Sequence, residues 1–132
     1  MPAHFELDRS QRIVHSRAWD ELTDADLLDH QAQILRLFQD GTLDATWAQI
    51  YDLSAVTNTL VSTDVVLRLV DENPWPAACL RVIVTPTVLQ YGLARMFQLR
   101  GNSKTKNMYV IRDAAEAQTT LRKAREQQHP VA

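Results

Sequence analysis

The chain has 132 residues, of which 45% are apolar and 23% charged, and its formal net charge is −2. This composition is typical of one soluble globular domain, and only three glycines and five prolines argue against low complexity. The N-terminus lacks the pattern of a signal peptide, no stretch approaches the roughly 18 apolar residues that span a bilayer, and the single Cys79 excludes an internal disulfide. We therefore expect one cytoplasmic domain over residues 1–132, with its core at about 3–126.

The charges are distributed unevenly along the chain. Residues 1–72 hold 13 acidic and 5 basic residues, whereas residues 73–112 hold six basic residues and no acidic one. If folding keeps these regions apart, the surface is dipolar and can orient a partner or attract an anion. The alternative is that the two regions neutralise each other across the fold.

The N-terminal segment predicts a hairpin followed by a helix. Residues 3–8 and 12–19 are typical of short strands around the polar turn DRSQ. The segment 22–41 predicts a helix that is capped by Thr23 and ends at Gly41. Its apolar residues recur at helical spacing, at Leu27, Leu28, Ile34, Leu35 and Phe38.

The middle of the chain predicts a strand, a loop and a second helix. Residues 47–53 form a short β-type run that contains Asp52, and the polar stretch 54–62 predicts a loop. Ser62 is a suitable cap for a helix that ends before Pro74 and Pro76. One face of this helix is expected to be buried, with Val65, Val66, Leu69 and Val70.

The rest of the chain predicts two strands and two helices. Residues 79–86 form a nearly continuous apolar strand, which is typical of a central strand covered on both faces. Pro86 is expected to open a third helix that Gly101 terminates. A last strand at 108–113 and a helix starting at Asp113 follow, and we expect 129–132 to be frayed.

The predicted order of elements is β-β-α-β-α-β-α-β-α. Strands that alternate with helices after an opening hairpin predict an α/β fold, with a mixed sheet and helices packed on it.

Several stretches resemble the small STAS-like family related to anti-sigma-factor antagonists, called SpoIIAA-like or STAS/SEC14. They are the hairpin, the strand IYDLSAV (50–56), and VIVTP (82–86) followed by GLARM (92–96). The resemblance covers roughly residues 5–125. It implies a regulatory or ligand-sensing domain that is not an enzyme and needs no cofactor.

The family's best-understood members switch by phosphorylation of a serine in an Asp-Ser-Ser-Gly loop before the second helix. The matching stretch here, TLVSTD (59–64), lacks the aspartate and the glycine, and Val61 stands near the acceptor position. The neighbouring Ser62 is the expected helix cap, so its hydroxyl is already committed to a backbone N–H. These departures argue against the switch, although a phosphate at a helix N-terminus would be electrostatically tolerable.

The predicted loop after the third strand is the first candidate site. Loops at the carboxyl ends of strands commonly bind ligands in open α/β sheets. Hydroxyl and amide groups there could hold a small polar ligand, and the candidate residues are Asp52, Ser54, Thr57, Asn58, Thr59 and Ser62. The simpler interpretation, which we favour, is that Asp52 and Ser54 only satisfy turn backbone groups.

Metal-dependent and hydrolytic chemistry find little support in the sequence. The histidines are scattered; His4 and His15 could approach each other across the hairpin, but no carboxylate or cysteine spacing completes a metal site. The chain lacks the nucleophile elbow, the P-loop and the glycine-rich dinucleotide turn. Cys79 opens a buried strand and is expected to be an inert packing residue. We therefore predict no catalytic residue and no metal.

The predicted third helix has more apolar residues than one buried face requires. Leu89, Leu93, Met96 and Phe97 form one stripe, while Val88, Tyr91 and Leu99 lie elsewhere around the helix. We expect a homodimer or partner interface here, complementary to the acidic first helix, with Tyr91, Arg95, Met96, Phe97 and Arg100. The alternatives are packing against a neighbouring helix and an apolar ligand.

Two functions follow from these observations. The first is a SpoIIAA-like regulatory or protein-interaction module that forms a homodimer. The second is a small-molecule or lipid-binding domain, whose ligand would be apolar or anionic. We expect no nucleic acid, because the pI is near 6.0 and stacking aromatics are not interleaved with the basic residues. Stable membrane attachment is not expected either, since the basic loop holds too few charges.

Overall fold

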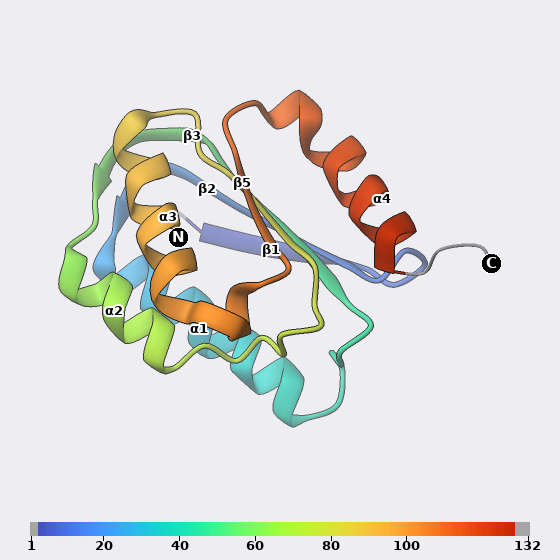
Figure 1. The fold of residues 1–132 in the computed structure, drawn as a ribbon. Helices are drawn as coiled ribbons and strands as arrows, with labels where there is room; N and C mark the ends of the chain where they lie inside the picture. The colour runs from blue at the N-terminus through green and yellow to red at the C-terminus, as the bar shows by residue number, and fades with distance from the viewer. Residues whose placement is uncertain (1–2, 129–132) are drawn as a thin grey trace.

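The computed structural model describes residues 3–128, which form a five-stranded sheet with helices on both of its faces (Figure 1). The strands are β1 (Ala3–Asp8), β2 (Ile13–Thr23), β3 (Ala48–Leu60), β4 (Arg81–Val84) and β5 (Met108–Ile111). The helices are α1 (Asp24–Gln39), α2 (Thr63–Asp71), α3 (Val88–Gly101) and α4 (Ala117–Gln128). Two short 3-10 helices, Asn102–Thr105 and Ala114–Glu116, follow α3 and precede α4.

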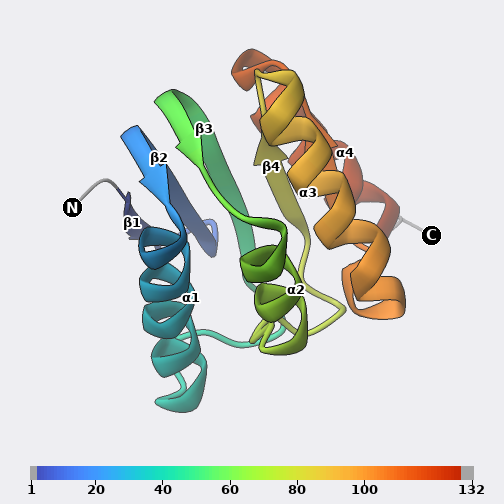
Figure 2. The same cartoon turned by 90° about the vertical axis from the view of Figure 1, so that its left-hand side faces the viewer.

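The sheet is mixed, and its strands lie in chain order. β1 and β2 form an antiparallel hairpin, and each later strand adds parallel to its predecessor. Helices α1, α2 and α3 cover one face of the sheet, while α4 packs on the other (Figure 2). The predicted α/β fold with a mixed sheet is therefore confirmed.

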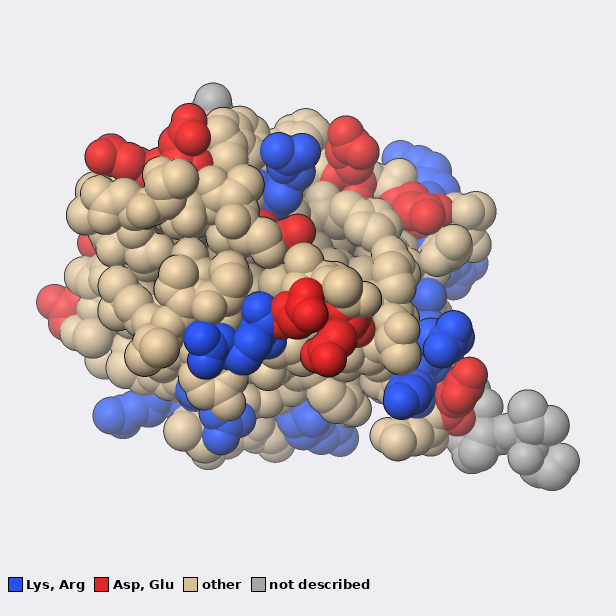
Figure 3. Space-filling model, turned by 90° about the horizontal axis from the view of Figure 1, so that it is seen from above, with Lys and Arg blue, Asp and Glu red and all other residues tan. Residues whose placement is uncertain are grey.

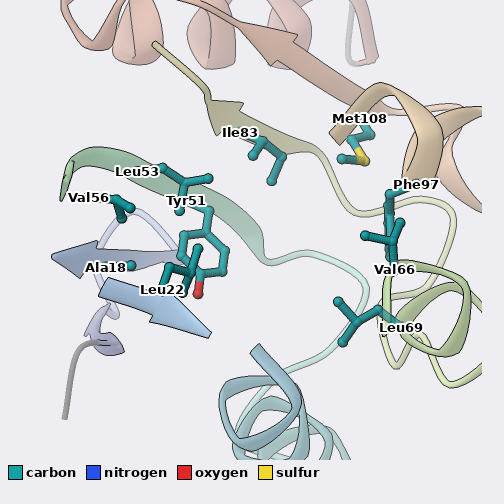
Figure 4. Packing of buried hydrophobic residues seen from close by; sticks show 10 residues of the cluster. All are labelled: Ala18, Leu22, Tyr51, Leu53, Val56, Val66, Leu69, Ile83, Phe97 and Met108. Atoms are coloured by element: carbon teal, nitrogen blue, oxygen red, sulfur yellow. The ribbon is translucent and has the colours of Figure 1, made fainter. Parts of the chain in front are cut away.

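Strand alternation sends successive side chains to opposite faces of the sheet. On β3, Tyr51 and Leu53 face α2 and α3, where Val66, Leu69 and Phe97 complete the cluster (Figure 4). On the opposite side, Ile50 of β3 and Val82 and Val84 of β4 pack against Leu121 of α4. A third cluster lies under α1 and contains Val14, Ile34, Leu43, Trp47, Trp75 and Cys79.

The prediction of a loop at 54–62 is wrong, because β3 continues to Leu60. It remains paired with β2, which is also longer than expected and ends at Thr23 opposite Leu60. The ladder accommodates two register shifts, and Asp20 beside the second of them has a φ of 56°. β2 thus pairs with one edge of the stretch 54–60, and a polar sequence does not prevent such pairing.

The helix caps of the first half are those that the sequence predicted. The Thr23 side chain accepts from Asp26 N in a capping box, and the Ser62 side chain accepts from Val65 N. Val66 and Leu69 of α2 are buried as expected, whereas Leu35 of α1 is exposed.

The ends of α3 differ from the prediction. Thr87 caps the helix in a capping box with Gln90, so Pro86 lies outside it. Gly101 is the last helical residue rather than the terminator, and Asn102 after it takes the positive φ of 54°. Of the predicted apolar stripe, Leu93, Met96 and Phe97 pack on the core, whereas Leu89 is exposed and Gln90 is buried beside them.

The C-terminal elements also differ at their ends. β4 and β5 are shorter than the predicted runs 79–86 and 108–113. Asp113 caps a 3-10 turn, and α4 begins only at Ala117. The predicted frayed end at 129–132 lies outside the described residues.

The two charge regions do not neutralise each other by direct pairing within residues 3–128. The ion pairs there are His4–Glu6 and Arg68–Glu72, and both are local contacts inside the acidic region. Seen from above, acidic groups lie at the upper left and basic groups along the lower edge, but acidic and basic side chains are interspersed over the rest of this face (Figure 3). None of the described helices combines the length and the apolar character needed to cross a membrane.

Candidate ligand-binding site

A cavity of about 120 Å³ lies between the sheet and the three helices on its first face. Leu22, Tyr51 and Ile83 form part of its sheet wall, while Leu69 of α2 and Phe97 of α3 form part of its helix wall. The lining is mostly apolar, because strand alternation and the inward helix faces both direct aliphatic and aromatic side chains here. A few polar side chains break this pattern.

A chain of hydrogen bonds crosses three neighbouring strands beside the cavity. His30 Nε2 of α1 lies 2.9 Å from Ser16 Oγ of β2. Gln49 of β3 donates through Nε2 to the same Ser16 Oγ at 3.1 Å, and its Oε1 accepts from Arg81 Nε of β4 at 3.0 Å. These residues meet because Ser16, Gln49 and Arg81 occupy inward positions of adjacent strands.

Arg81 is the charged end of this chain, and its charge has no carboxylate partner within ion-pair distance among residues 3–128. Its Nη1 is buried without a hydrogen-bond partner in the described part of the chain. The guanidinium carbon lies 5.2 Å from the centre of the Trp75 ring and 5.5 Å from that of Phe97. Burial lowers the pKa of Arg81 to about 10, so the group is still a cation at neutral pH.

Tyr51 supplies a second donor to the same cavity. Its hydroxyl is buried and has no hydrogen-bond partner among residues 3–128, and its ring centre lies 4.6 Å from that of His30. Burial raises the pKa of Tyr51 above its ordinary value, so the hydroxyl stays protonated. Figure 4 shows this side chain extending from β3 away from the sheet.

Two other titratable groups nearby are held neutral. Burial, followed by the charge of Arg81, lowers the pKa of His30 to about 4. Burial raises the pKa of Cys79 to about 11, so the thiol is protonated at neutral pH. Cys79 packs among apolar residues, as an inert packing residue would.

The arrangement offers two buried hydrogen-bond donors, one of them charged, to an acceptor. A protonated guanidinium and a phenol both present buried hydrogens that lack acceptors. The neighbouring histidine and cysteine are neutral with pKa values far from 7, which makes them poor proton-transfer groups at that pH.

The candidate residues of the predicted loop do not form one site, because they lie on different faces of the sheet. Thr59 lines the cavity and accepts from Gln90 Nε2 at 3.2 Å. Asp52 lies on the opposite face of the sheet and accepts from Ser54 N at 2.8 Å, as the simpler interpretation expected. Ser54, Thr57 and Asn58 are exposed on β3.

Ser62 lies at the start of α2 and is bound to α1. Its hydroxyl donates to Asp24 Oδ2 at 2.9 Å and accepts from Val65 N at 3.2 Å. Its backbone N–H also donates to Asp24, at 2.8 Å. The hydroxyl is therefore committed, as the sequence suggested.

The predicted interface residues do not share one surface. Phe97 is buried and lines the cavity, which contradicts its assignment to an interface. Met96 packs partly buried against the core, and Tyr91 lies under the guanidinium of Arg112. Arg95 donates to Gln98 within α3, and Arg100 is exposed.

His4 and His15 do line a common groove, which lies between the hairpin and α4. Residues 3–128 contain no group of three histidine, cysteine or acidic side chains that could hold a metal ion.

The sequence interpretation missed Ser16, His30, Gln49, Tyr51 and Arg81 as a group. One signal was present: Arg81 stands in a strand that was expected to be covered on both faces. A charge at a covered position is expensive unless something compensates it, so such an arginine indicates a site.

No protein-family model matches the chain, and comparison with curated proteins finds no significant match. The SpoIIAA-like resemblance thus stays a prediction from the quoted motifs.

Proposed function

We propose that the chain is a non-catalytic, SpoIIAA-like domain that binds a small molecule in the cavity between its sheet and α1, α2 and α3. The observation that carries the proposal is an apolar cavity whose wall contains two buried donors without acceptors, on Tyr51 and Arg81. Buried polar groups are nearly always satisfied in folded proteins. A bound ligand would satisfy both.

The size of the cavity favours a small molecule over a lipid. A cavity of about 150 Å³ in another protein accommodates benzene, and the space here is about 120 Å³. A phospholipid or a long fatty acid would require the helices to move apart. The ligand that fits this conformation has an apolar part no larger than a single ring.

The state of Ser62 favours ligand occupancy over phosphorylation as the signal. A phosphate on this hydroxyl would lie against the Asp24 carboxylate, which now accepts two hydrogen bonds from Ser62. Ligand binding would instead stabilise α2 and α3, which form the wall opposite the sheet. A buried, unpaired Cys79 also suits a reducing cytoplasm, the location that we propose.

A screen of small apolar compounds by thermal shift and amide NMR tests the binding function. Binders should raise the melting temperature and shift amide signals of α2 and α3. Ala94 lines the cavity, so Ala94→Phe should fill it and abolish binding. Ala25→Phe, at an exposed position of α1, is the control and should bind normally. Binding that survives Ala94→Phe, or the lack of any binder, would refute this function.

A second candidate is a homodimer that uses the outward face of α3. Val88 and Leu99 are 77% and 64% exposed, and their spacing of 11 residues places them on one side of the helix. The basic residues after this helix and the acidic α1 would be complementary across two copies.

Sedimentation of the variant Val88→Asp/Leu99→Asp tests this candidate more directly than any change at the buried Phe97. A wild-type dimer that becomes a folded monomer would support it. A wild type that is monomeric at high concentration would exclude it.

A further inference from the structure

We propose that the ligand of the cavity is a small monocarboxylate with an apolar body, and that its carboxylate binds Arg81 and Tyr51. The inference rests on the proposed binding function and names the class of ligand.

The charge of Arg81 is the first reason. A buried cation is costly unless an opposite charge or a set of acceptors compensates it. Arg81 has one hydrogen bond, to Gln49 Oε1, and aromatic rings on two sides, but none of the acidic residues within 3–128 forms an ion pair with it. An ordered water could accept from Nη1, but it would leave the charge without a counter-ion. An anion would accept the hydrogen bond from Nη1 and would also supply the counter-ion.

The position of Tyr51 is the second reason. Gln49 is paired with Arg81 across β3 and β4, and Tyr51 is two residues further along β3 on the same face. Diagonal neighbours of this kind are within reach of long side chains. Arg81 and Tyr51 line one cavity, and the buried Nη1 of the first and the phenol hydroxyl of the second each lack an acceptor among residues 3–128. A carboxylate offers two oxygens, one for each donor.

The surrounding groups favour a single negative charge. The site holds one cation, because His30 is neutral and bound to Ser16. Carboxylates also act on the groups of this site: Asp26 of α1 on Tyr51, Asp29 of α1 on His30, and Asp44 on Cys79. A doubly charged anion such as phosphate would exceed the available positive charge and would be repelled by these carboxylates.

The apolar wall of the cavity determines the size and the polarity of the part of the ligand beyond its carboxylate. Ile83, Leu69 and Phe97 surround the space that remains beyond the two donors. By comparison with a benzene-sized cavity, the apolar part of the ligand has at most about six non-hydrogen atoms. Benzoate and pentanoate are suitable probes, and benzamide and pentanamide are their uncharged counterparts.

The experiment is calorimetry and thermal shift at pH 7.5 with these four probes. Both acids are fully ionised at this pH. We expect the acids to bind the wild type and the amides to bind about tenfold more weakly or not at all. Arg81→Gln should weaken acid binding by about tenfold or more, and Tyr51→Phe by a smaller factor. Arg122→Gln, which removes an exposed arginine of α4, should leave binding unchanged.

The outcomes separate the inference from the function on which it rests. If acids and amides bind equally well and Ala94→Phe blocks both, the cavity binds ligands but the carboxylate assignment is wrong. If no probe binds and inorganic phosphate does, the assignment is also wrong. Should Arg81→Gln fail to fold, the acid-to-amide ratio of the wild type and the acid affinity of Tyr51→Phe decide, since a preference for the acids together with a weaker acid affinity in Tyr51→Phe supports the assignment, and the lack of either contradicts it.

Discussion

At the scale of single residues, the polar side chains under α1 and α3 reduce stability more than they add to it. Arg81 and Tyr51 each bury an atom without a partner among residues 3–128. Each such atom costs about 1–3 kcal/mol. Apolar residues at these positions would pack without this penalty, so their presence indicates a role other than stability.

The hydrogen bond between Gln49 and Arg81 can be tested by a pair of variants. Gln49→Leu removes the acceptor of Arg81 Nε and should reduce the free energy of unfolding by about 2 kcal/mol. Adding Arg81→Met removes the guanidinium charge that Gln49→Leu leaves without its acceptor, so the double variant should be at least as stable as the wild type. Urea unfolding measures both. A double variant less stable than Gln49→Leu alone would show that Arg81 stabilises the fold.

His30 predicts a pH dependence of stability. Its pKa is about 4 in the folded chain against an ordinary 6.5, so the unfolded chain binds the proton more tightly. The free energy of unfolding should therefore be flat above pH 7 and fall by about 3 kcal/mol between pH 6.5 and 4. Asp8, Asp40 and Asp44 have lowered pKa values, so their contribution is lost only below this window.

Urea unfolding at a series of pH values measures the effect. His30→Gln can still bond to Ser16 and should flatten the profile between pH 6.5 and 4. His4→Gln, which removes an exposed histidine, serves as the control. An unchanged slope in His30→Gln would contradict the assignment.

At the scale of elements, α3 shows that polar and small residues can stand on the buried face of a helix. Gln90, Ala94, Phe97 and Gly101 recur at helical spacing; Gln90 and Phe97 are buried, and Ala94 packs partly buried against the core together with Leu93 and Met96. Gly101 lies at the end of this row, against Thr105 of the following 3-10 helix, whose hydroxyl donates to Gln98 O. The outward positions, such as Gly92, have free space.

Alanine at the two glycines of α3 should have opposite effects. A Cβ on Gly101 would meet the Thr105 side chain at 2.4 Å, whereas one on Gly92 meets nothing within 4 Å. Gly92→Ala should therefore raise the free energy of unfolding by about 0.5–1 kcal/mol. Gly101→Ala should lower it by about 1–3 kcal/mol, because Thr105 must move. Chemical denaturation of both variants measures the difference, and equal effects would exclude this explanation.

At the scale of the whole molecule, the sheet separates two cores with different roles. The face under α1, α2 and α3 contains the cavity and the polar chain. The face under α4 is packed by aliphatic residues, including Ile50, Val82 and Leu121. We expect ligand binding to depend on the first face and stability to depend on both.

Leu121→Ala tests this separation. Leu121 is 2% exposed, so its truncation should cost about 2–5 kcal/mol in the free energy of unfolding. The affinity for benzoate should stay within twofold of the wild type at a temperature where the variant is folded. A tenfold loss of affinity would show that the two faces are coupled.

Much of the architecture could be predicted from local signals. Thr23 and Ser62 cap α1 and α2 as expected, and the alternation of strands and helices gave the correct fold class. Pairing between distant segments could not be predicted in the same way. The residues 54–60 are polar and resemble a loop, yet β2 provides a partner for their backbone along its whole length.

The sequence by itself determined the order of the elements, the N-caps of α1 and α2 and the α/β class, because these depend on periodicity and on side chains a few residues apart. The tertiary structure alone decided the site. Ser16, Gln49 and Arg81 are separated by more than 30 residues from one to the next, and strand pairing places them side by side. It also decided that Arg81 has no carboxylate partner among residues 3–128, since the compensation of a buried charge depends on every segment packed around it.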